Sequence, residues 1–293
     1  QSQNLKMLRR RKKTIIETTN KTKLFGILGT PVAHTLSPAM HSFMAEQNKI
    51  DMAYLAFDVP PEKLGDTMRG VKAIGACGFN ITAPHKICVM DYLDHICPEA
   101  QHMNSVNTVV NRNGVWHGFN TDGNGYCESL LLEGHEIKNK NILMMGAGGS
   151  ARSLAFTLAK SGAKSISITS RSMEKIHIIG EMVEHYTETI FYDTLDKAKD
   201  YDIVINTTPV GMHGAGDSGN PCGFMDLIHE NIIYNPKETV FLKEAKKRGA
   251  RIHNGLGMLV LQGILAFELF CEISLDHKRT YEQLMHLFDY YRI

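Results

Sequence analysis

The chain has 293 residues, which is enough for two domains of ordinary size. Apolar residues make up 43% of it and charged residues 22%, a composition typical of a globular protein. A net charge of +1 gives no reason to expect nucleic acid or a membrane surface as a partner. No apolar stretch reaches the roughly 20 residues that cross a bilayer. No apolar segment follows the basic run at residues 9–13, so a secretory signal is not expected. Since this run is N-terminal and has no flanking structural pattern, we expect residues 1–20 to be a disordered or expression-derived segment.

The cysteines and histidines give no sign of a metal site. The six cysteines are scattered and form no C-x-x-C pair, so we expect reduced thiols in a cytoplasmic protein. None of the 14 histidines has the spacing that would place two ligands on one face of a helix. The sequence therefore predicts no bound metal.

Short apolar runs alternate with helical patterns, which predicts a parallel α/β fold. Ser37 and Pro38 are typical of a helix start, with a hydroxyl at the N-cap and proline at the first helical position. The Asn-Gly pair in Arg112-Asn113-Gly114 indicates a tight hairpin. In the first half we expect strands at 24–28, 52–58, 78–82, 107–111 and 115–119, and helices at 37–48 and 62–74.

A second series of strands and helices begins after Asp122. It contains no internal repeat and no low-complexity segment. The expected strands are 141–145, 165–169, 202–206 and 231–234, and the expected helices are 123–133, 173–185 and 239–248, followed by two C-terminal helices at 258–271 and 280–290.

A glycine-rich turn follows the strand at 141–145. It fits the dinucleotide-binding pattern G-x-G-x-x-A and opens a helix rich in alanine and leucine. Glycine lets the backbone turn tightly and approach a pyrophosphate, and the helix N-terminus offers free N–H groups and a positive dipole end. The sequence predicts a cofactor site at Gly146, Ala147, Gly148, Gly149, Ser150 and Ala151.

The end of the next strand indicates which dinucleotide is bound. An NAD site carries Asp or Glu about 20 residues after the glycines, to hold the ribose 2′-hydroxyl. This sequence has Ser170, Arg171 and Ser172 there, with Lys175 one turn later and no acid. Since a guanidinium binds phosphate through two parallel hydrogen bonds, these residues favour NADP. The alternative is that Arg171 is a solvated loop residue and the site accepts both cofactors.

Four polar motifs precede the glycine turn, and three more follow it. They are Gly29-x-Pro31-x-x-His34-Thr35-x-Ser37-Pro38, Asn80-x-Thr82-x-Pro84-x-Lys86, Val106-Asn107-Thr108, Asn120-Thr121-Asp122-Gly123, Asn206-Thr207-Thr208-Pro209, Tyr234-Asn235-Pro236 and Gly255-Leu256-Gly257-Met258 through Gln262-Gly263. In this order the chain resembles the shikimate dehydrogenase family, which also includes the quinate/shikimate dehydrogenases, from about Phe25 to Phe270.

The resemblance implies a catalytic pair, Lys86 and Asp122. An alcohol that loses a hydride must also lose a proton, so a positioned acid or base is required. A plain surface ion pair is the alternative. The resemblance also implies substrate contacts from Thr35, Ser37, Thr82, Asn107, Tyr234 and Gln262, and further cofactor contacts from Thr207, Gly255 and Met258. For Met258, packing in the core is the alternative.

The resemblance implies an α/β fold of two domains. Residues 21–121 with 255–293 would bind the substrate, residues 122–254 would form a Rossmann-like NADP domain, and the C-terminal helices would return to the first domain. The expected reaction is the reversible NADPH-dependent reduction of 3-dehydroshikimate to shikimate, in aromatic amino acid and chorismate biosynthesis. The partners would be small molecules, with no nucleic acid or membrane, in a monomer or homodimer.

Two positions depart from the family pattern. Thr35 replaces a serine, which leaves the choice between shikimate and quinate partly open, although Ser37 and Thr82 favour shikimate. Ser170 replaces an asparagine, which bears on the strictness for NADP. The alternatives are a quinate/shikimate dehydrogenase that uses both NAD and NADP, and a non-catalytic NADP-binding regulatory paralogue.

Overall fold

The computed structural model describes residues 18–33, 35–191, 200–211, 228–231 and 238–290. Its first half contains strands and helices close to those expected from the sequence. They are β1 (Lys23–Gly29), α2 (Ser37–Asn48), β2 (Met52–Asp58), η1 (Pro61–Lys63), α3 (Leu64–Ala73), β3 (Gly78–Ile81), η2 (Cys88–Tyr92), β4 (His95–Ile96), α4 (Pro98–Met103), β5 (Thr108–Arg112) and β6 (Val115–Phe119).

The first sheet has six strands in the order β2-β1-β3-β5-β6-β4. Its β1, β2 and β3 strands pair in parallel, but β3 pairs with β5, and β5 with β6, in antiparallel fashion. The predicted hairpin is confirmed, with Asn113 and Gly114 at φ values of 55° and 85°. Because so short a turn can join only antiparallel strands, this sheet is mixed: the predicted hairpin is antiparallel, whereas β1, β2 and β3 pair in parallel, as the alternation of strands and helices predicts.

The second half forms a parallel sheet in the order β12-β11-β10-β7-β8-β9. Helices follow its strands, as in dinucleotide-binding folds. The elements are α5 (Asp122–Leu132), β7 (Asn141–Met145), α6 (Gly149–Lys160), β8 (Ser165–Thr169), α7 (Met173–Val183), β9 (Glu188–Phe191), β10 (Ile203–Asn206), β11 (Ile228–Asn231), α8 (Val240–Lys247), β12 (Ile252–His253), α9 (Leu256–Cys271) and α10 (His277–Tyr290).

Some predicted boundaries differ from the structure. The helix expected at 62–74 begins as the 3₁₀ turn η1 before α3. The structure describes β11 at Ile228–Asn231, and residues 232–234 of the strand expected at 231–234 lie outside the described residues. The N-cap of α2 is Leu36, not Ser37, and it makes no side-chain capping bond. The backbone N–H of Ser37 instead donates to the hydroxyl of Thr35, so the Ser37 hydroxyl is not used as a cap.

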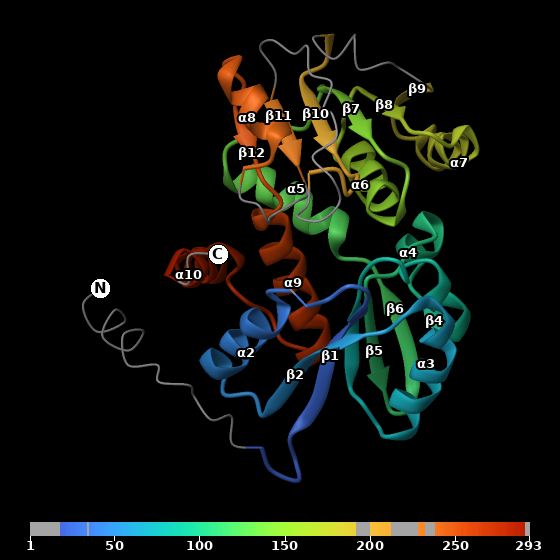
Figure 1. Ribbon diagram of the computed structural model, residues 1–293, viewed down its shortest axis with the longest axis vertical. Coiled ribbons are helices and arrows are strands. Elements are labelled where there is room, and N and C mark those ends of the chain that lie inside the picture. The colour runs from blue at the N-terminus through green and yellow to red at the C-terminus, as the bar shows by residue number, and fades with distance from the viewer. Residues whose placement is uncertain (1–17, 34, 192–199, 212–227, 232–237, 291–293) are drawn as a thin grey trace.

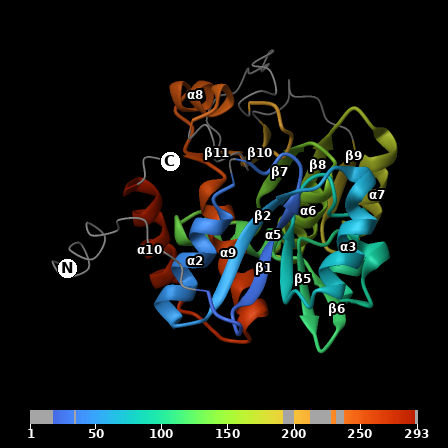
Figure 2. The same cartoon turned by 60° about the horizontal axis from the view of Figure 1, so that its bottom comes forward.

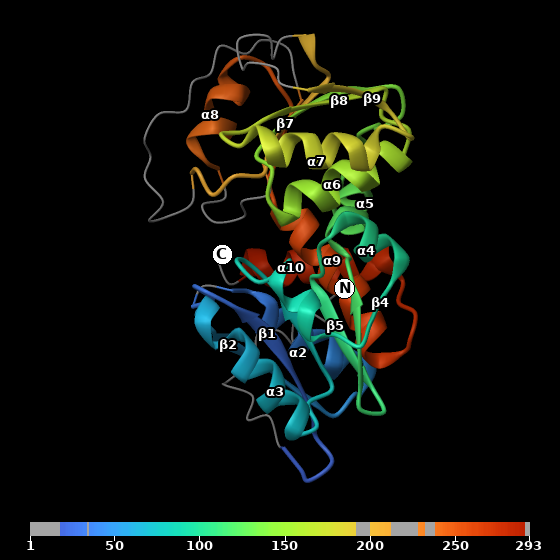
Figure 3. The ribbon, with the colours of Figure 1, turned by 90° about the vertical axis from the view of Figure 1, so that its right-hand side faces the viewer.

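Helix α9 joins the two halves of the molecule. Figure 1 shows the second sheet above the first, with α5 and α9 between them. Figures 2 and 3 show the same arrangement from two other directions. Helix α9 contacts α5, α2, α10 and β5, and its side chains share one core with those of β1 and α2. The predicted return of the C-terminal helices to the first half is therefore confirmed. Among the described helices, none is both long and apolar enough to span a membrane.

The crossing of α5 and α9 depends on the absence of a side chain at Gly125. A Cβ at this position would lie 2.4 Å from the backbone nitrogen of Gln262 and 2.7 Å from its Cα. We expect Gly125→Ala to lower the free energy of unfolding by about 3 kcal/mol, because both helices would have to move apart. Urea unfolding, followed by far-UV circular dichroism, measures this loss.

Gly70 in α3 provides the matched control. A Cβ there would meet nothing within 4 Å, so Gly70→Ala removes backbone freedom without a clash. We expect it to raise stability by about 0.5–1 kcal/mol. If both substitutions changed stability equally, the close approach at Gly125 would not be the cause.

Candidate active site

The structure brings Lys86 and Asp122 together. Lys86 lies in the turn after β3, and Asp122 is the first residue of α5. The Lys86 Nζ atom lies 2.6 Å from Asp122 Oδ2, and the side chains are only 14% and 5% exposed. Asp122 Oδ1 accepts a 2.7 Å hydrogen bond from the Asn107 amide. The pair is thus held in one orientation in a largely buried position, unlike a surface ion pair.

The glycine turn of the second sheet reaches the same lysine. Lys86 Nζ donates to the hydroxyl of Ser150 at 3.2 Å. A Cβ at Gly149 would lie 3.4 Å from Lys86 Cβ. The N-terminus of α6 therefore lies beside the lysine–carboxylate pair, and a group bound at the glycine turn would be close to both.

Asn107 connects this pair to the C-terminal helix. Its amide nitrogen lies 2.9 Å from the Thr121 hydroxyl and 3.4 Å from Gln262 Oε1, while its oxygen accepts from the Thr121 backbone N–H at 2.8 Å. The Thr121 hydroxyl also donates to the Gln262 backbone carbonyl at 3.0 Å. Gln262 on α9 is thus fixed next to Asn107, as the sequence motifs predicted for two residues of one site.

A second buried network lies behind Asn107. The Tyr54 hydroxyl donates to Asn80 Oδ1 at 2.7 Å, and the Asn80 amide contacts the backbone carbonyl of Asn107 at 3.3 Å. Burial raises the pKa of Tyr54 well above its usual value, with a weaker opposing effect from Ser37, so the phenol stays protonated. His41 stacks on Tyr54 with ring centroids 4.1 Å apart, and burial lowers the pKa of His41 to about 3.

Two of the predicted substrate residues lie at the start of α2, where Thr35 is half-buried and Ser37 is buried. The Thr35 hydroxyl donates to the Ser37 hydroxyl at 3.1 Å, and Ser37 is 3% exposed. Thr82 follows β3, with its methyl group against Gly29 at the end of β1. Tyr234 lies outside the described residues, so its predicted place in the site is not described.

The glycine turn has the backbone that a dinucleotide requires. Gly146 has φ +108°, a value that other residues rarely adopt, and a Cβ there would lie 2.4 Å from the Thr207 hydroxyl. Thr207 donates that hydroxyl to the Met145 carbonyl at 2.7 Å and so holds the ends of β7 and β10 together. A Cβ at Gly148 would meet nothing within 4 Å. The space in front of the α6 N-terminus is therefore open to a phosphate group, while Ala147 and Ala151 are buried beneath it.

The predicted phosphate-binding residues lie at the end of β8. Arg171 and Lys175 are exposed, and Ser170 and Ser172 are half-buried. The Ser172 hydroxyl caps α7 by accepting from the Lys175 backbone N–H. The Ser172 hydroxyl therefore already accepts one hydrogen bond from the helix backbone, whereas the exposed Arg171 guanidinium is accessible to a ligand.

The two remaining predicted cofactor residues lie at the start of α9. Gly255 is the N-cap of this helix. Met258 is 7% exposed and belongs to the same apolar cluster as Ile142, Leu154 and Ile205 of the second sheet and its helices. Its side chain is thus a core residue, which was the alternative interpretation.

Sequence reasoning did not assign Thr121, Asn80 or Tyr54 to the site. Thr121 and Asn80 stand inside motifs that supplied other residues, so their motif position is the signal that could have identified them. Tyr54 carries no such signal, because a tyrosine in a strand is more often a packing residue.

A parallel sheet with a dinucleotide turn, placed against a buried lysine–carboxylate pair, defines the chain as a nicotinamide-dependent dehydrogenase. The shikimate dehydrogenase substrate-binding domain matches residues 27–109, and the shikimate/quinate 5-dehydrogenase domain matches residues 130–211. The chain belongs to the shikimate dehydrogenase family.

Individual relatives match nearly the whole chain. A shikimate dehydrogenase (NADP⁺) of Bacillus anthracis is 42% identical over 85% of this chain and 92% of its own. A solved shikimate dehydrogenase in complex with NADP⁺ is 39% identical, with a TM-score of 0.81 over 91% of this chain and 97% of its own. The Thermus thermophilus enzyme, solved with NADP(H) and shikimate, is 33% identical, with a TM-score of 0.79 over 89% of this chain and 99% of its own.

Proposed function

We propose that this chain is an NADP-dependent shikimate dehydrogenase, which converts 3-dehydroshikimate, NADPH and a proton reversibly to shikimate and NADP⁺. Family membership and the names of relatives at about 42% identity support this function. The single observation that carries it is the buried Lys86–Asp122 pair in contact with Ser150 of the cofactor turn. A non-catalytic NADP-binding paralogue would have no need of such a pair.

Lys86 and Asp122 would handle the proton of the reacting hydroxyl. As the alcohol carbon becomes a carbonyl, the oxygen must lose a proton, and in the reverse direction it must gain one. Lys86 Nζ can accept or donate that proton, while Asp122 holds the nitrogen and carries the compensating charge. Asn107 keeps the carboxylate in place through its 2.7 Å bond. The lysine can also stabilise negative charge that develops on the substrate oxygen.

The residues around the glycine turn fit NADP. The cofactor, when bound, supplies or accepts the hydride. The open N-terminus of α6 at Gly148 and Gly149 would bind its pyrophosphate, and Arg171 would bind its 2′-phosphate. These residues orient the cofactor, and none of them takes part in proton transfer.

The substrate carboxylate and ring hydroxyls would meet hydroxyl and amide groups from the first half of the chain and from α9. We assign the carboxylate to Thr35, Ser37 and Thr82, and the ring hydroxyls to Asn107 and Gln262. Ser37 and Asn107 are each 3% exposed, so an analogue that failed to match them would leave buried polar groups unpaired. Ser37 and Thr82 both keep their hydroxyl side chains and so leave less room for the extra hydroxyl of quinate, which supports shikimate as the substrate.

We place the substrate domain at residues 21–121 with 255–293, and the NADP domain at 122–254. The shared core of α2, α9 and α10 supports this division, although Met258 belongs to the core of the second sheet. The five described cysteines are free thiols, which supports a cytoplasmic protein. We expect a monomer or a homodimer.

Initial rates with shikimate and with quinate, each tested with NADP⁺ and with NAD⁺, test this function. We expect turnover mainly with shikimate and NADP⁺. Comparable rates with quinate or NAD⁺ would assign the chain to the enzymes of dual specificity. An absence of turnover with all four pairs would refute the proposal and favour a regulatory paralogue.

Arg171 gives a direct test of cofactor selectivity. We expect Arg171→Ala to lower kcat/KM for NADP⁺ by about 10- to 100-fold, the value of one charged hydrogen bond to phosphate. The rate with NAD⁺ is the internal control and should change little, because NAD⁺ lacks the 2′-phosphate. An equal loss with both cofactors would mean that Arg171 supports the loop rather than the phosphate.

A further inference from the structure

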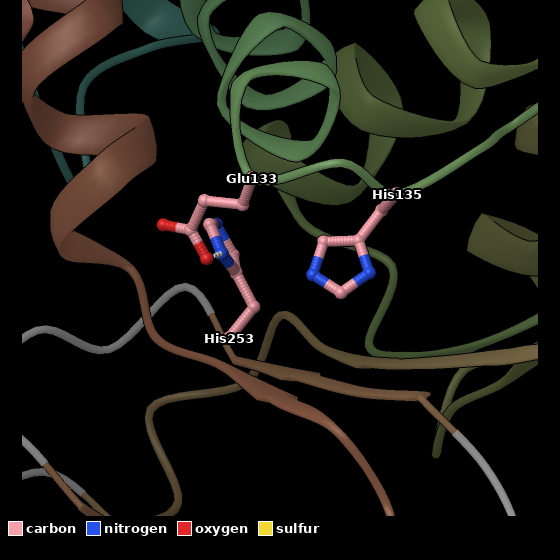
Figure 4. Close-up of side chains that lie close together, drawn as sticks. All are labelled: Glu133, His135 and His253. Carbon is pink, nitrogen blue, oxygen red and sulfur yellow. Dashed lines mark hydrogen bonds and ion pairs between the residues drawn. The ribbon is translucent and has the colours of Figure 1, made fainter.

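Three possible metal ligands converge at the far end of α5. Glu133 directly follows this helix, His135 lies two residues later, and His253 ends β12. Their ligand atoms all lie within 4.8 Å of one another. Figure 4 shows the Glu133 carboxylate and the two imidazole rings grouped together, with Glu133 bonded to His253.

The hydrogen bonds of His253 place a positive charge between its ring and Glu133. The Ser129 hydroxyl donates its only proton to the Tyr126 carbonyl at 2.7 Å. It must therefore accept from His253 Nε2, which lies 3.1 Å away. The other ring nitrogen, Nδ1, lies 2.8 Å from Glu133 Oε2. A lone pair facing a carboxylate at this distance would be repulsive, so either a proton or a metal cation must lie between them.

His135 adds a second imidazole to the cluster. The residue is 5% exposed, and Figure 4 shows its ring with Nε2 toward His253 and the Glu133 carboxylate and Nδ1 on the far side. A proton shared by His253 and Glu133 involves only those two residues, whereas a cation between all three would also bind His135 Nε2. Burial, and after it the positive charge of the exposed Arg251, lower the pKa of His135.

We propose that Glu133, His135 and His253 bind a Zn²⁺ ion. Two imidazoles and one carboxylate are a donor set that zinc prefers, with water as the fourth ligand. Zinc–ligand bonds of about 2.0–2.1 Å put ligand atoms roughly 3.3 Å apart, so a shift of at most about 1.5 Å completes the site. The Glu133 side chain is 38% exposed, which gives the ion a path from solvent. Ser129 fixes the His253 ring from behind, as outer partners of metal ligands do.

The ion would have a structural role and would not take part in the reaction. Asp122 and Glu133 lie at opposite ends of α5, which separates them by roughly 16 Å at 1.5 Å per residue. The ion would join the end of α5 to the end of β12, directly before α9. Tyr281 adds α10 to this junction, since its hydroxyl donates to Glu133 Oε1 at 3.2 Å. Zinc would therefore fix the segments that connect the two sheets.

Direct binding of zinc tests the proposal. The full chain, without a histidine tag and stripped of metal with EDTA, is titrated with ZnCl₂ in a calorimeter. We expect one strong site per chain and a rise of several degrees in Tm. His135→Gln should weaken that affinity by more than about 100-fold, since even an outer partner of a metal ligand contributes 10- to 100-fold. The substitution breaks no hydrogen bond of Nδ1, so the protein should still fold.

A second histidine pair provides the control. His95 and His117 stack at 5.1 Å on neighbouring strands β4 and β6 and could bind zinc at the surface. The variant His95→Gln/His117→Gln should keep the strong site unchanged. Should circular dichroism show that His135→Gln is misfolded, Glu133→Gln replaces it as the test. Weak binding by the wild type, equal binding by wild type and the ligand variant, or loss of the site only in the control would overturn the proposal.

Discussion

We expect Lys86→Ala to lower kcat for shikimate oxidation by about 10³-fold, within the 10²- to 10⁴-fold range of a positioned acid or base. The substitution removes the group 2.6 Å from Asp122 and 3.2 Å from Ser150. No other described side chain donates to that oxygen of Asp122. The KM for shikimate should change far less, because the hydroxyl and amide groups that would bind the substrate remain. Steady-state rates with saturating NADP⁺ measure both quantities.

Lys63→Ala is the matched control, because Lys63 is exposed at the end of η1 and lies outside the site. It should retain wild-type kcat. The Tm of both variants must be compared with that of the wild type, since loss of Lys86 leaves a buried carboxylate without its cation. A Lys86→Ala protein that is folded and turns over normally would remove this lysine from proton transfer.

The main strands and helices follow from local sequence patterns. The strands at 52–58, 141–145 and 165–169 occur at the predicted residues, because short apolar runs, or the alternation of isoleucine with polar residues at 165–169, have few alternatives between polar turns. The short strands β4, β9 and β12 were not predicted. Two of them have only two residues and no periodicity, and each forms because a neighbouring strand offers free backbone groups.

The contacts within the site depend on tertiary structure more than the strands and helices do. The family resemblance implied that Lys86, Asp122, Asn107 and Gln262 belong to one site, and the structure places them in one hydrogen-bond network. The sequence alone could not predict that Tyr54 and Asn80 support Asn107 from behind, because that contact depends on which strands are neighbours. The capping role expected for Ser37 is wrong because Thr35 makes the local hydrogen bond instead.

The cluster of Glu133, His135 and His253 illustrates the same limit. A search for ligands spaced along one helix cannot detect it, because one of its members comes from a strand more than a hundred residues away. Only the parallel pairing of β11 with β12 and the packing of α9 on α5 bring His253 to the end of α5.

Asp122→Asn is expected to lower kcat by about 10²- to 10⁴-fold, although it preserves the shape of the side chain. The two carboxylate oxygens accept from two donors, Lys86 Nζ and Asn107 Nδ2, at 2.6 Å and 2.7 Å. Asparagine offers a single oxygen, so its own NH₂ group must face one of those donors in a site where residue 122 is 3% exposed. Asp66→Asn, at an exposed position in α3, is the control and should leave kcat unchanged.

The double variant Lys86→Ala/Asp122→Asn tests whether the pair acts as a unit. If Asp122 acts only by orienting Lys86 and stabilising its positive charge, then replacing Asp122 should lower kcat little further once Lys86 is absent. The double variant should then be about as slow as the slower single variant, as for other catalytic groups that act together. Rate losses that multiply would instead mean that Asp122 contributes independently of Lys86, for example by binding the substrate through the oxygen now bonded to Asn107.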